Sequence, residues 1–138
     1  MRVPYVNLGA QHQEDRDELL AKVAELLDSG MFILGKEVER FEEKIAQICE
    51  TKYAVGVANG TDSLMLSMRA LGVNCGDEVI TVSHSYLASA SSIALIGAKP
   101  VLIDVDEHFN MNQSVMEEAI TPNTKAIIVV HLTGRPAD

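Results

Sequence analysis

The sequence has few of the residues that mark disulfide-bonded, metal-binding or nucleic-acid-binding proteins. Among its 138 residues there are two cysteines, Cys49 and Cys75, and no C-x-x-C pair, which excludes a disulfide framework and a cysteine-rich zinc site. Lysine and arginine together number 11, against 20 aspartates and glutamates, for a formal net charge of -9. Because so acidic a surface repels phosphate backbones and anionic lipids, we expect neither a nucleic acid nor a membrane as a partner.

The sequence also lacks a clear targeting or membrane-spanning segment. No apolar stretch of the kind found in secretory signal peptides opens the chain, and unpaired cysteines suit a reducing compartment, so we expect a cytoplasmic protein. The longest uncharged run, residues 79–98, is interrupted by serine, threonine, histidine and tyrosine. We therefore expect a strand, a loop and a helix there rather than a membrane span.

Four short apolar runs recur along the second part of the chain, at residues 53–58, 78–82, 100–103 and 125–130. The spacing predicts helices between them, over residues 62–71, 86–96 and 115–120. Gly72 and Gly97 stand where glycines commonly end helices. Apolar strands that alternate with helices predict an α/β fold, a three-layer parallel sheet with helices on both faces.

Two amphipathic helices are predicted before the first apolar run, over residues 14–29 and 36–49, and the apolar link 31–34 joins them. This N-terminal helical pair precedes the sheet. The sequence thus predicts a helical segment at residues 1–50 and a βα-repeat part at residues 51–138.

The candidate binding residues lie in the loops that follow the predicted strands, because ligands of open α/β sheets bind outside the carboxyl ends of the strands. Asn59-Gly-Thr-Asp62 follows the first run and opens a helix, where free N–H groups and a helix dipole suit a phosphate. Gly60 permits close approach of the backbone, and Thr61 adds a hydroxyl. A plain helix cap made by Thr61 or Asp62 is an equal alternative.

Tyr86 follows the second run, where an aromatic ring could stack on a flat ligand. A tyrosine packed at the start of a helix is the simpler interpretation of this position from the residues alone.

The other polar residues at this edge give weaker signals. His84 and His131 follow strands, but no Cys/His cluster has zinc spacing, so no metal site is expected. Asp104 and Asp106 could pair at a Mg²⁺ ion, although a solvated loop is the better interpretation.

At this point the sequence resembles the DegT/StrS family. The stretch Val57-Ala-Asn-Gly-Thr-Asp-Ser-Leu64 is one of its motifs. Further matching segments run in order over essentially the whole chain: residues 3–8, 29–35, 37–42, 70–72, 76–81, 97–101, 119–122, 124–128 and 130–134. Members of this family are pyridoxal-phosphate-dependent aminotransferases of fold type I that act on nucleotide-linked keto sugars.

The resemblance implies a cofactor site in this chain. The family holds the cofactor phosphate at the turn that matches Gly60, Thr61 and Asp62, and packs an aromatic residue that matches Tyr86 on the pyridine ring. It implies pyridoxal 5'-phosphate as cofactor, glutamate as amino donor, a nucleotide-linked sugar as substrate and a homodimer. The chain departs from the family pattern at His84 and Thr133, and these departures bear on the choice of sugar rather than on the chemistry.

The family's Schiff-base lysine and the aspartate that faces the pyridine nitrogen lie beyond the matched part, and no lysine here is predicted at a carboxyl edge of the sheet. The lysines are Lys22, Lys36, Lys44, Lys52, Lys99 and Lys125. We therefore expect the N-terminal part of a larger aminotransferase, inactive alone and with no catalytic residue of its own. The alternatives are a pyridoxal-phosphate-dependent sugar dehydratase of the same family and a stand-alone phosphate- or nucleotide-binding module.

Overall fold

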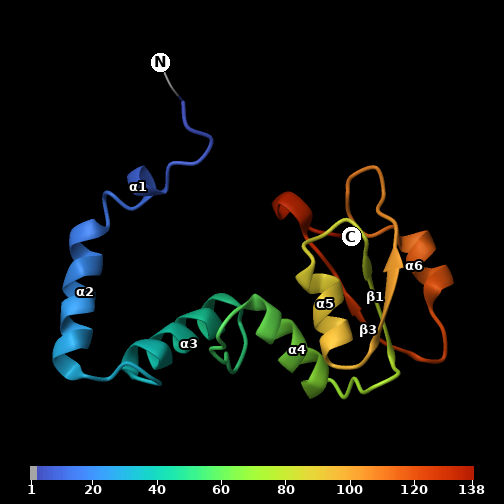
Figure 1. Cartoon of the computed structure of the whole chain (residues 1–138), viewed down its shortest axis with the longest axis horizontal. Helices are drawn as coiled ribbons and strands as arrows, with labels where there is room; N and C mark the ends of the chain where they lie inside the picture. The colour runs from blue at the N-terminus through green and yellow to red at the C-terminus, as the bar shows by residue number, and fades with distance from the viewer. Residues whose placement is uncertain (1–2) are drawn as a thin grey trace. The chain divides into compact units, whose positions relative to one another are not determined.

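The computed structural model describes residues 3–138 and divides into two units, Met1–Gly56 and Val57–Asp138, which are described separately (Figure 1). The first unit contains α1 (Leu8–Gln11), α2 (Arg16–Ser29) and α3 (Lys36–Ile48). The second contains α4 (Gly60–Ala70), β1 (Glu78–Val82), α5 (Ala88–Leu95), β2 (Lys99–Ile103), α6 (Gln113–Ala119), β3 (Thr124–Ile128) and the 3-10 turn η1 (Leu132–Gly134).

The helices of the first unit are stabilised by local interactions. α2 ends at Gly30, whose φ of 65° is the left-handed conformation that glycine adopts at low cost. α3 carries Glu37 and Glu39 in its first turn, where negative charge is favourable. Among residues 3–56, Ala46 is the one buried residue, so this unit has almost no core of its own.

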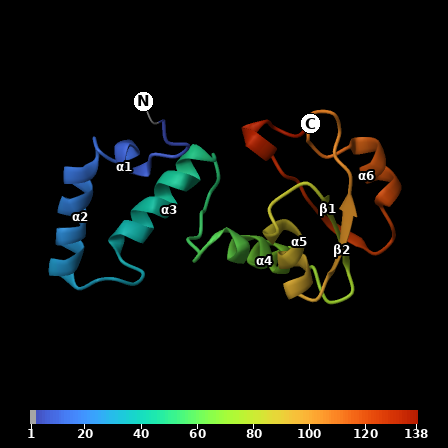
Figure 2. The ribbon, with the colours of Figure 1, turned by 45° about the horizontal axis from the view of Figure 1, so that its top comes forward.

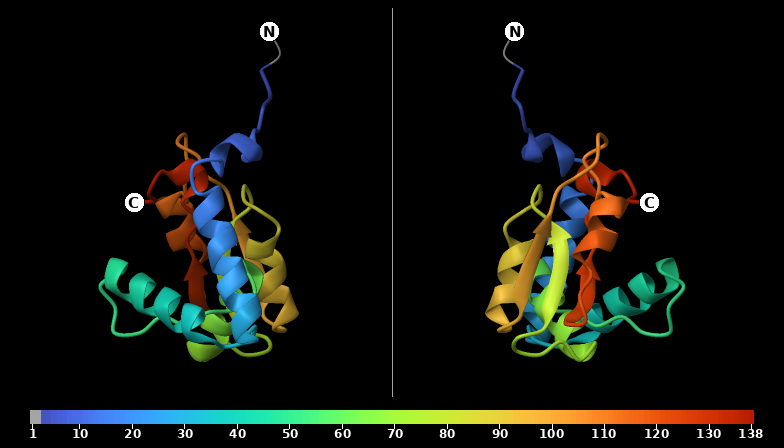
Figure 3. Two further views of the ribbon diagram at one scale, coloured as in Figure 1. Left: turned by 90° about the vertical axis from the view of Figure 1, so that its left-hand side faces the viewer. Right: turned by 90° about the vertical axis from the view of Figure 1, so that its right-hand side faces the viewer.

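The second unit is built on a three-stranded sheet with the order β2-β1-β3 (Figure 3). Both pairings are parallel, and Glu78 of β1 lies opposite Lys99 of β2 and Thr124 of β3. All five residues of β1 are buried, as expected of a central strand covered on both faces. The predicted α/β class with a parallel sheet is confirmed.

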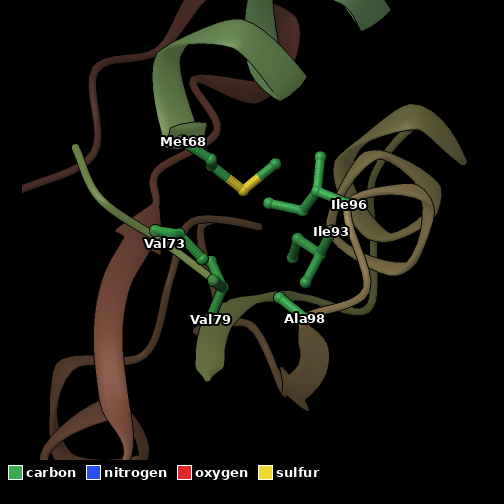
Figure 4. Close-up of a cluster of buried hydrophobic side chains, with 6 residues drawn as sticks. All are labelled: Met68, Val73, Val79, Ile93, Ile96 and Ala98. Carbon is green, nitrogen blue, oxygen red and sulfur yellow. The ribbon is translucent and has the colours of Figure 1, made fainter. Parts of the chain in front are cut away.

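Helices cover both faces of this sheet (Figure 2). The first hydrophobic cluster joins α4 and α5 to one face of β1 (Figure 4): Met68, Val73, Val79, Ile93, Ile96 and Ala98. The second cluster lies on the opposite face and packs against side chains of α6: Ile80, Val82, Ile103 and Met111. Because Val79 and Ile80 are consecutive in β1, their side chains point to opposite faces, which gives the three predicted layers.

The prediction of a strand over residues 53–58 was wrong. These residues form no strand, and Tyr53 and Val55 are 74% and 79% exposed. The backbone N–H of Gly56 donates instead to Oε1 of Glu42 on α3, at 2.6 Å. The apolar pattern indicates burial but does not supply a neighbouring strand, and without one the backbone cannot form a ladder.

The predicted helices all form, with boundaries that differ by a few residues. Gly72 and Gly97 have φ of 81° and 80°, so both end helices in the left-handed conformation as predicted. Within residues 3–138, no helix combines the length and the apolar character that crossing a bilayer requires.

Candidate functional site

The first turn of α4 is capped by Asn59. This residue is extended, with φ −164° and ψ 173°, and its Oδ1 accepts a hydrogen bond from the N–H of Asp62 at 2.9 Å. The N–H of Ser63 donates to the Asn59 carbonyl at 3.1 Å. The expectation that Thr61 or Asp62 would provide the cap was therefore wrong, because Asn59, two residues before Thr61, is the cap.

Three backbone donors remain at this helix end. The N–H groups of Asn59, Gly60 and Thr61 have no hydrogen-bond partner within residues 3–138, and neither does the Thr61 hydroxyl. A Cβ built on Gly60 would meet no atom within 4 Å, so the space in front of the turn is open. The free N–H groups of Gly60 and Thr61, a hydroxyl and the positive end of an 11-residue helix are a suitable donor set for a phosphate.

Asp62 lies in the same turn, and its carboxylate is already engaged. Oδ2 of Asp62 accepts a hydrogen bond from Nδ2 of Asn59 at 3.0 Å. The Asn59 side chain thus makes two hydrogen bonds with Asp62: it accepts one from the Asp62 backbone N–H and donates one to the Asp62 carboxylate. This negative charge is favourable at the helix start, but it opposes a second anion placed nearby.

Tyr86 lies between β1 and α5 and is 82% exposed. Its backbone carbonyl accepts from the N–H of Ser89 at 3.0 Å, and its hydroxyl has no hydrogen-bond partner among residues 3–138. This degree of exposure does not fit the packed tyrosine of the simpler interpretation and leaves the ring free to contact a ligand. α4 and α5 pack together through Met68 and Ile93, but no hydrogen bond in the described part of the chain joins Tyr86 to the first turn of α4.

The loop after β2 reaches toward the loop after β1. The rings of His84 and Phe109 lie with centroids 5.7 Å apart and tilted by 38°. Phe109 has a φ of 64°, a left-handed conformation that is uncommon for an aromatic residue. Phe109 could not be singled out from the sequence, since nothing in the apolar pattern distinguishes it from an ordinary loop residue.

Asp104 and Asp106 organise this loop. Oδ1 of Asp106 accepts from the N–H groups of His108 at 2.8 Å and Asn110 at 3.0 Å, and Asp104 binds the N–H of Val105 at 2.8 Å. The hydrogen bond from the Asn110 N–H is the main cause that lowers the pKa of Asp106 below its ordinary value. Within residues 3–138, no group of three His, Cys, Asp or Glu side chains is placed to hold a metal ion.

Both lysines of the second unit lie away from the carboxyl ends of the strands. Lys99 begins β2, and its Nζ donates to Oε1 of Glu78 at 2.8 Å. Lys125 is the second residue of β3. Both therefore lie near the amino ends, as predicted.

Comparison with known proteins gives consistent matches. The family model of the DegT/DnrJ/EryC1/StrS aminotransferase family matches residues 13–138. A dTDP-3-amino-3,4,6-trideoxy-alpha-D-glucose transaminase from Streptomyces venezuelae is 47% identical over 99% of this chain and 36% of its own length. A UDP-2-acetamido-2-deoxy-3-oxo-D-glucuronate aminotransferase from Pseudomonas aeruginosa is 43% identical over 99% of this chain and 38% of its own length.

Solved structures match over the same length. S. venezuelae DesV, crystallised with a ketimine intermediate, superposes with a TM-score of 0.96 at 46% identity, covering 99% of this chain and 37% of DesV. Bacillus subtilis NtdA, with bound cofactor PMP, superposes with a TM-score of 0.95 at 32% identity, covering 99% of this chain and 32% of NtdA. The second unit, Val57–Asp138, is thus part of a fold type I architecture, and the chain spans about a third of the length of these relatives. The chain belongs to the DegT/DnrJ/EryC1/StrS aminotransferase family.

Proposed function

We propose that this chain is the N-terminal part of a pyridoxal-phosphate-dependent aminotransferase that converts a nucleotide-linked keto sugar to an amino sugar, with glutamate as donor. The observation that carries the proposal is the open first turn of α4, where the N–H groups of Gly60 and Thr61 are free. The names of the two transaminases cited above and the PMP bound to NtdA support the choice of substrate and cofactor.

The residues of this turn fit the phosphate of the cofactor. The N–H groups of Gly60 and Thr61 donate to phosphate oxygens, the Thr61 hydroxyl adds a third donor, and the start of α4 favours the negative charge. Gly60 matters because a side chain there would fill the space that the phosphate needs. Asp62 lies in the same turn, and its backbone N–H is bound by the side chain of Asn59.

Tyr86 supplies the apolar surface for the pyridine ring. Its exposed ring can pack on the flat face of the cofactor and keep water from it. The bound cofactor supplies the electron sink that amino transfer needs, while the protein binds and orients it. We assign the lysine that holds the cofactor covalently to sequence outside this chain, since Lys99 and Lys125 lie near the amino ends of the strands.

We further propose a cytoplasmic homodimer. Exposed apolar side chains in the link between α2 and α3 are available for a subunit contact: Met31, Phe32, Ile33 and Leu34. Both cysteines are free, which is compatible with a reducing compartment.

The proposal is tested with the complete protein that carries this segment. Purified protein is mixed with pyridoxal phosphate, glutamate and a panel of dTDP- and UDP-linked keto sugars, and both the 2-oxoglutarate and the amino sugar formed are measured. We expect equimolar 2-oxoglutarate and amino sugar from at least one substrate. Loss of the sugar hydroxyl without amino transfer would instead identify a dehydratase and overturn the proposal.

A further inference from the structure

We propose that Asn59 is a positioning residue for the phosphate site, which keeps the carboxylate of Asp62 from occupying the free donors of Gly60 and Thr61. This inference rests on the proposed function, because it concerns the turn to which the cofactor phosphate is assigned. It adds a role for two residues that do not themselves touch the phosphate.

The first step is that both polar atoms of the Asn59 side chain are used on one residue. Oδ1 accepts from the Asp62 N–H at 2.9 Å, and Nδ2 donates to Asp62 Oδ2 at 3.0 Å. The amide orientation is fixed by this network, since a flipped amide would place its oxygen against the carboxylate and lose the cap. Asn59 therefore holds the Asp62 carboxylate at a defined place.

The second step concerns what Asp62 would do without this partner. Aspartate side chains in the first turn of a helix bind nearby free backbone N–H groups. The available ones in this turn are those of Asn59, Gly60 and Thr61, and the last two are the donors that a phosphate would use. A released Asp62 carboxylate would thus compete with the phosphate within the molecule and place a like charge beside it.

The third step is that substitutions can separate the two functions of Asn59, which are to cap α4 and to hold the Asp62 carboxylate. Serine is an equally good helix cap, because its hydroxyl accepts the same N–H, but it lacks the amide nitrogen that donates to the carboxylate of Asp62 in this turn. Asn59→Ser therefore keeps the cap and removes the hydrogen bond from Nδ2 to Asp62. Asp62→Asn removes the charge and keeps an acceptor for the Asn59 amide, so the two substitutions form a matched pair.

The experiment measures the dissociation constants of pyridoxal phosphate and of pyridoxal for the complete protein and three variants: Asn59→Ser, Asp62→Asn and the double variant. The ratio of the two constants isolates the phosphate, since both ligands share the ring and the aldehyde. We expect Asn59→Ser to weaken pyridoxal phosphate on the order of tenfold, which corresponds to about 1.4 kcal/mol, and to leave pyridoxal unchanged. In the Asp62→Asn background the same substitution should change neither ligand.

The possible outcomes distinguish failure of the positioning role of Asn59 from failure of the proposed function. An equal effect of Asn59→Ser in both backgrounds, or an equal effect on pyridoxal, would show that Asn59 only caps the helix and would overturn the inference alone. Unchanged affinity for pyridoxal phosphate in Asn59→Ser would do the same. If the unaltered protein does not bind pyridoxal phosphate, the proposed function fails and the inference fails with it. Circular dichroism of each variant confirms that the fold is retained.

Discussion

Lys99 Nζ lies 2.8 Å from Oε1 of Glu78, and the two residues face each other across β2 and β1 in the sheet register. The other carboxylate oxygen of Glu78 accepts from the Thr121 hydroxyl at 2.6 Å, while its backbone N–H donates to the Asn123 carbonyl at 2.9 Å. A buried glutamate thus joins the amino ends of all three strands. The hydrogen bond from Lys99, followed by that from Thr121, lowers the pKa of the Glu78 carboxyl.

This network predicts a stability that depends on acid pH. Because the pKa of Glu78 is lower in the folded state than its ordinary value of 4.5, ionised Glu78 stabilises the fold above about pH 4.5. That contribution is lost as the pH falls through the folded-state value. Urea unfolding of the complete protein at a series of pH values should show Glu78→Gln to be less stable than wild type near neutrality, with the difference shrinking below about pH 4.5.

Glu118→Gln is the matched control, because Glu118 is an exposed carboxylate on α6. The free energy of unfolding of Glu118→Gln should change with pH as that of the wild-type protein does. A Glu78→Gln curve that is parallel to wild type throughout would show that the ionised carboxylate contributes nothing to stability.

A second prediction compares two residues of α5. Ile93 is fully buried in the cluster between α4, α5 and β1, whereas Leu95 is 68% exposed. Ile93→Ala should lower the free energy of unfolding by about 2–5 kcal/mol, since it leaves a cavity as well as losing buried surface. Leu95→Ala should change it by about 0.5 kcal/mol or less. Urea unfolding of both variants measures the difference, and equal losses would show that this cluster is not the core of the second unit.

The parts of the fold that could be predicted are those determined by local pattern. β1 is buried on both faces, while β2 and β3 are partly exposed, yet all three carry the continuous apolar runs by which the sequence predicts them. Gly72 and Gly97 mark helix ends because glycine alone adopts the required φ at no cost. The run at residues 53–58 has the same pattern but no neighbouring strand, and pairing is a property of the whole sheet rather than of the run.

At the candidate site, the sequence predicts that Gly60 and Thr61 lie at the start of a helix, and the structure places them in the first turn of α4. The strand expected before this turn does not form. The sequence also indicates the cap by Asn59, since asparagine three residues before an aspartate is common at helix starts. The prediction placed the cap at Thr61 or Asp62 instead. The contact between His84 and Phe109 depends on how two loops fold back, which no local pattern specifies.

The first unit predicts self-association of the isolated chain. Four apolar side chains of α2 are more than half exposed: Leu19, Leu20, Val23 and Leu27. Exposed apolar surface of this kind favours association, because contact with another apolar surface removes it from water. Analytical ultracentrifugation of residues 1–138 should show association that increases with concentration, and the paired substitution Val23→Glu and Leu27→Glu should reduce it. A compact monomer with cooperative unfolding at high temperature would contradict this prediction and favour a stand-alone module.

The isolated chain is also expected to lack a specific covalent site for the cofactor. Its lysines in the second unit, Lys99 and Lys125, lie near the amino ends of the strands, and Lys99 is paired with Glu78. After incubation with pyridoxal phosphate and reduction with borohydride, peptide mapping should find weak labelling spread over several lysines. One lysine labelled in stoichiometric amount would contradict the assignment of the cofactor-binding lysine to sequence outside this chain.

The last prediction ranks three substitutions at the proposed cofactor site of the complete protein. Gly60→Val should weaken pyridoxal phosphate most, because its side chain would fill the open space in front of the turn. The φ of Gly60 is not in the left-handed region, so the helix should still form and the loss is attributed to the ligand rather than to strain. Thr61→Ala removes one hydrogen bond to a charged group, worth about 1.5–3 kcal/mol. Tyr86→Ala removes ring packing, worth about 0.5–1.5 kcal/mol beyond the buried area.

Cofactor titration of each purified variant, with folding checked by circular dichroism, measures this order. Thr61→Ser is the matched control, since it keeps the hydroxyl and should bind the cofactor nearly as tightly as wild type. The comparison with pyridoxal separates the two parts of the site: Gly60→Val and Thr61→Ala act through the phosphate, whereas Tyr86→Ala should weaken both ligands equally. If Gly60→Val folds normally and binds pyridoxal phosphate like wild type, the phosphate does not lie at the start of α4, and the site must be sought at the loops that carry His84 and Phe109.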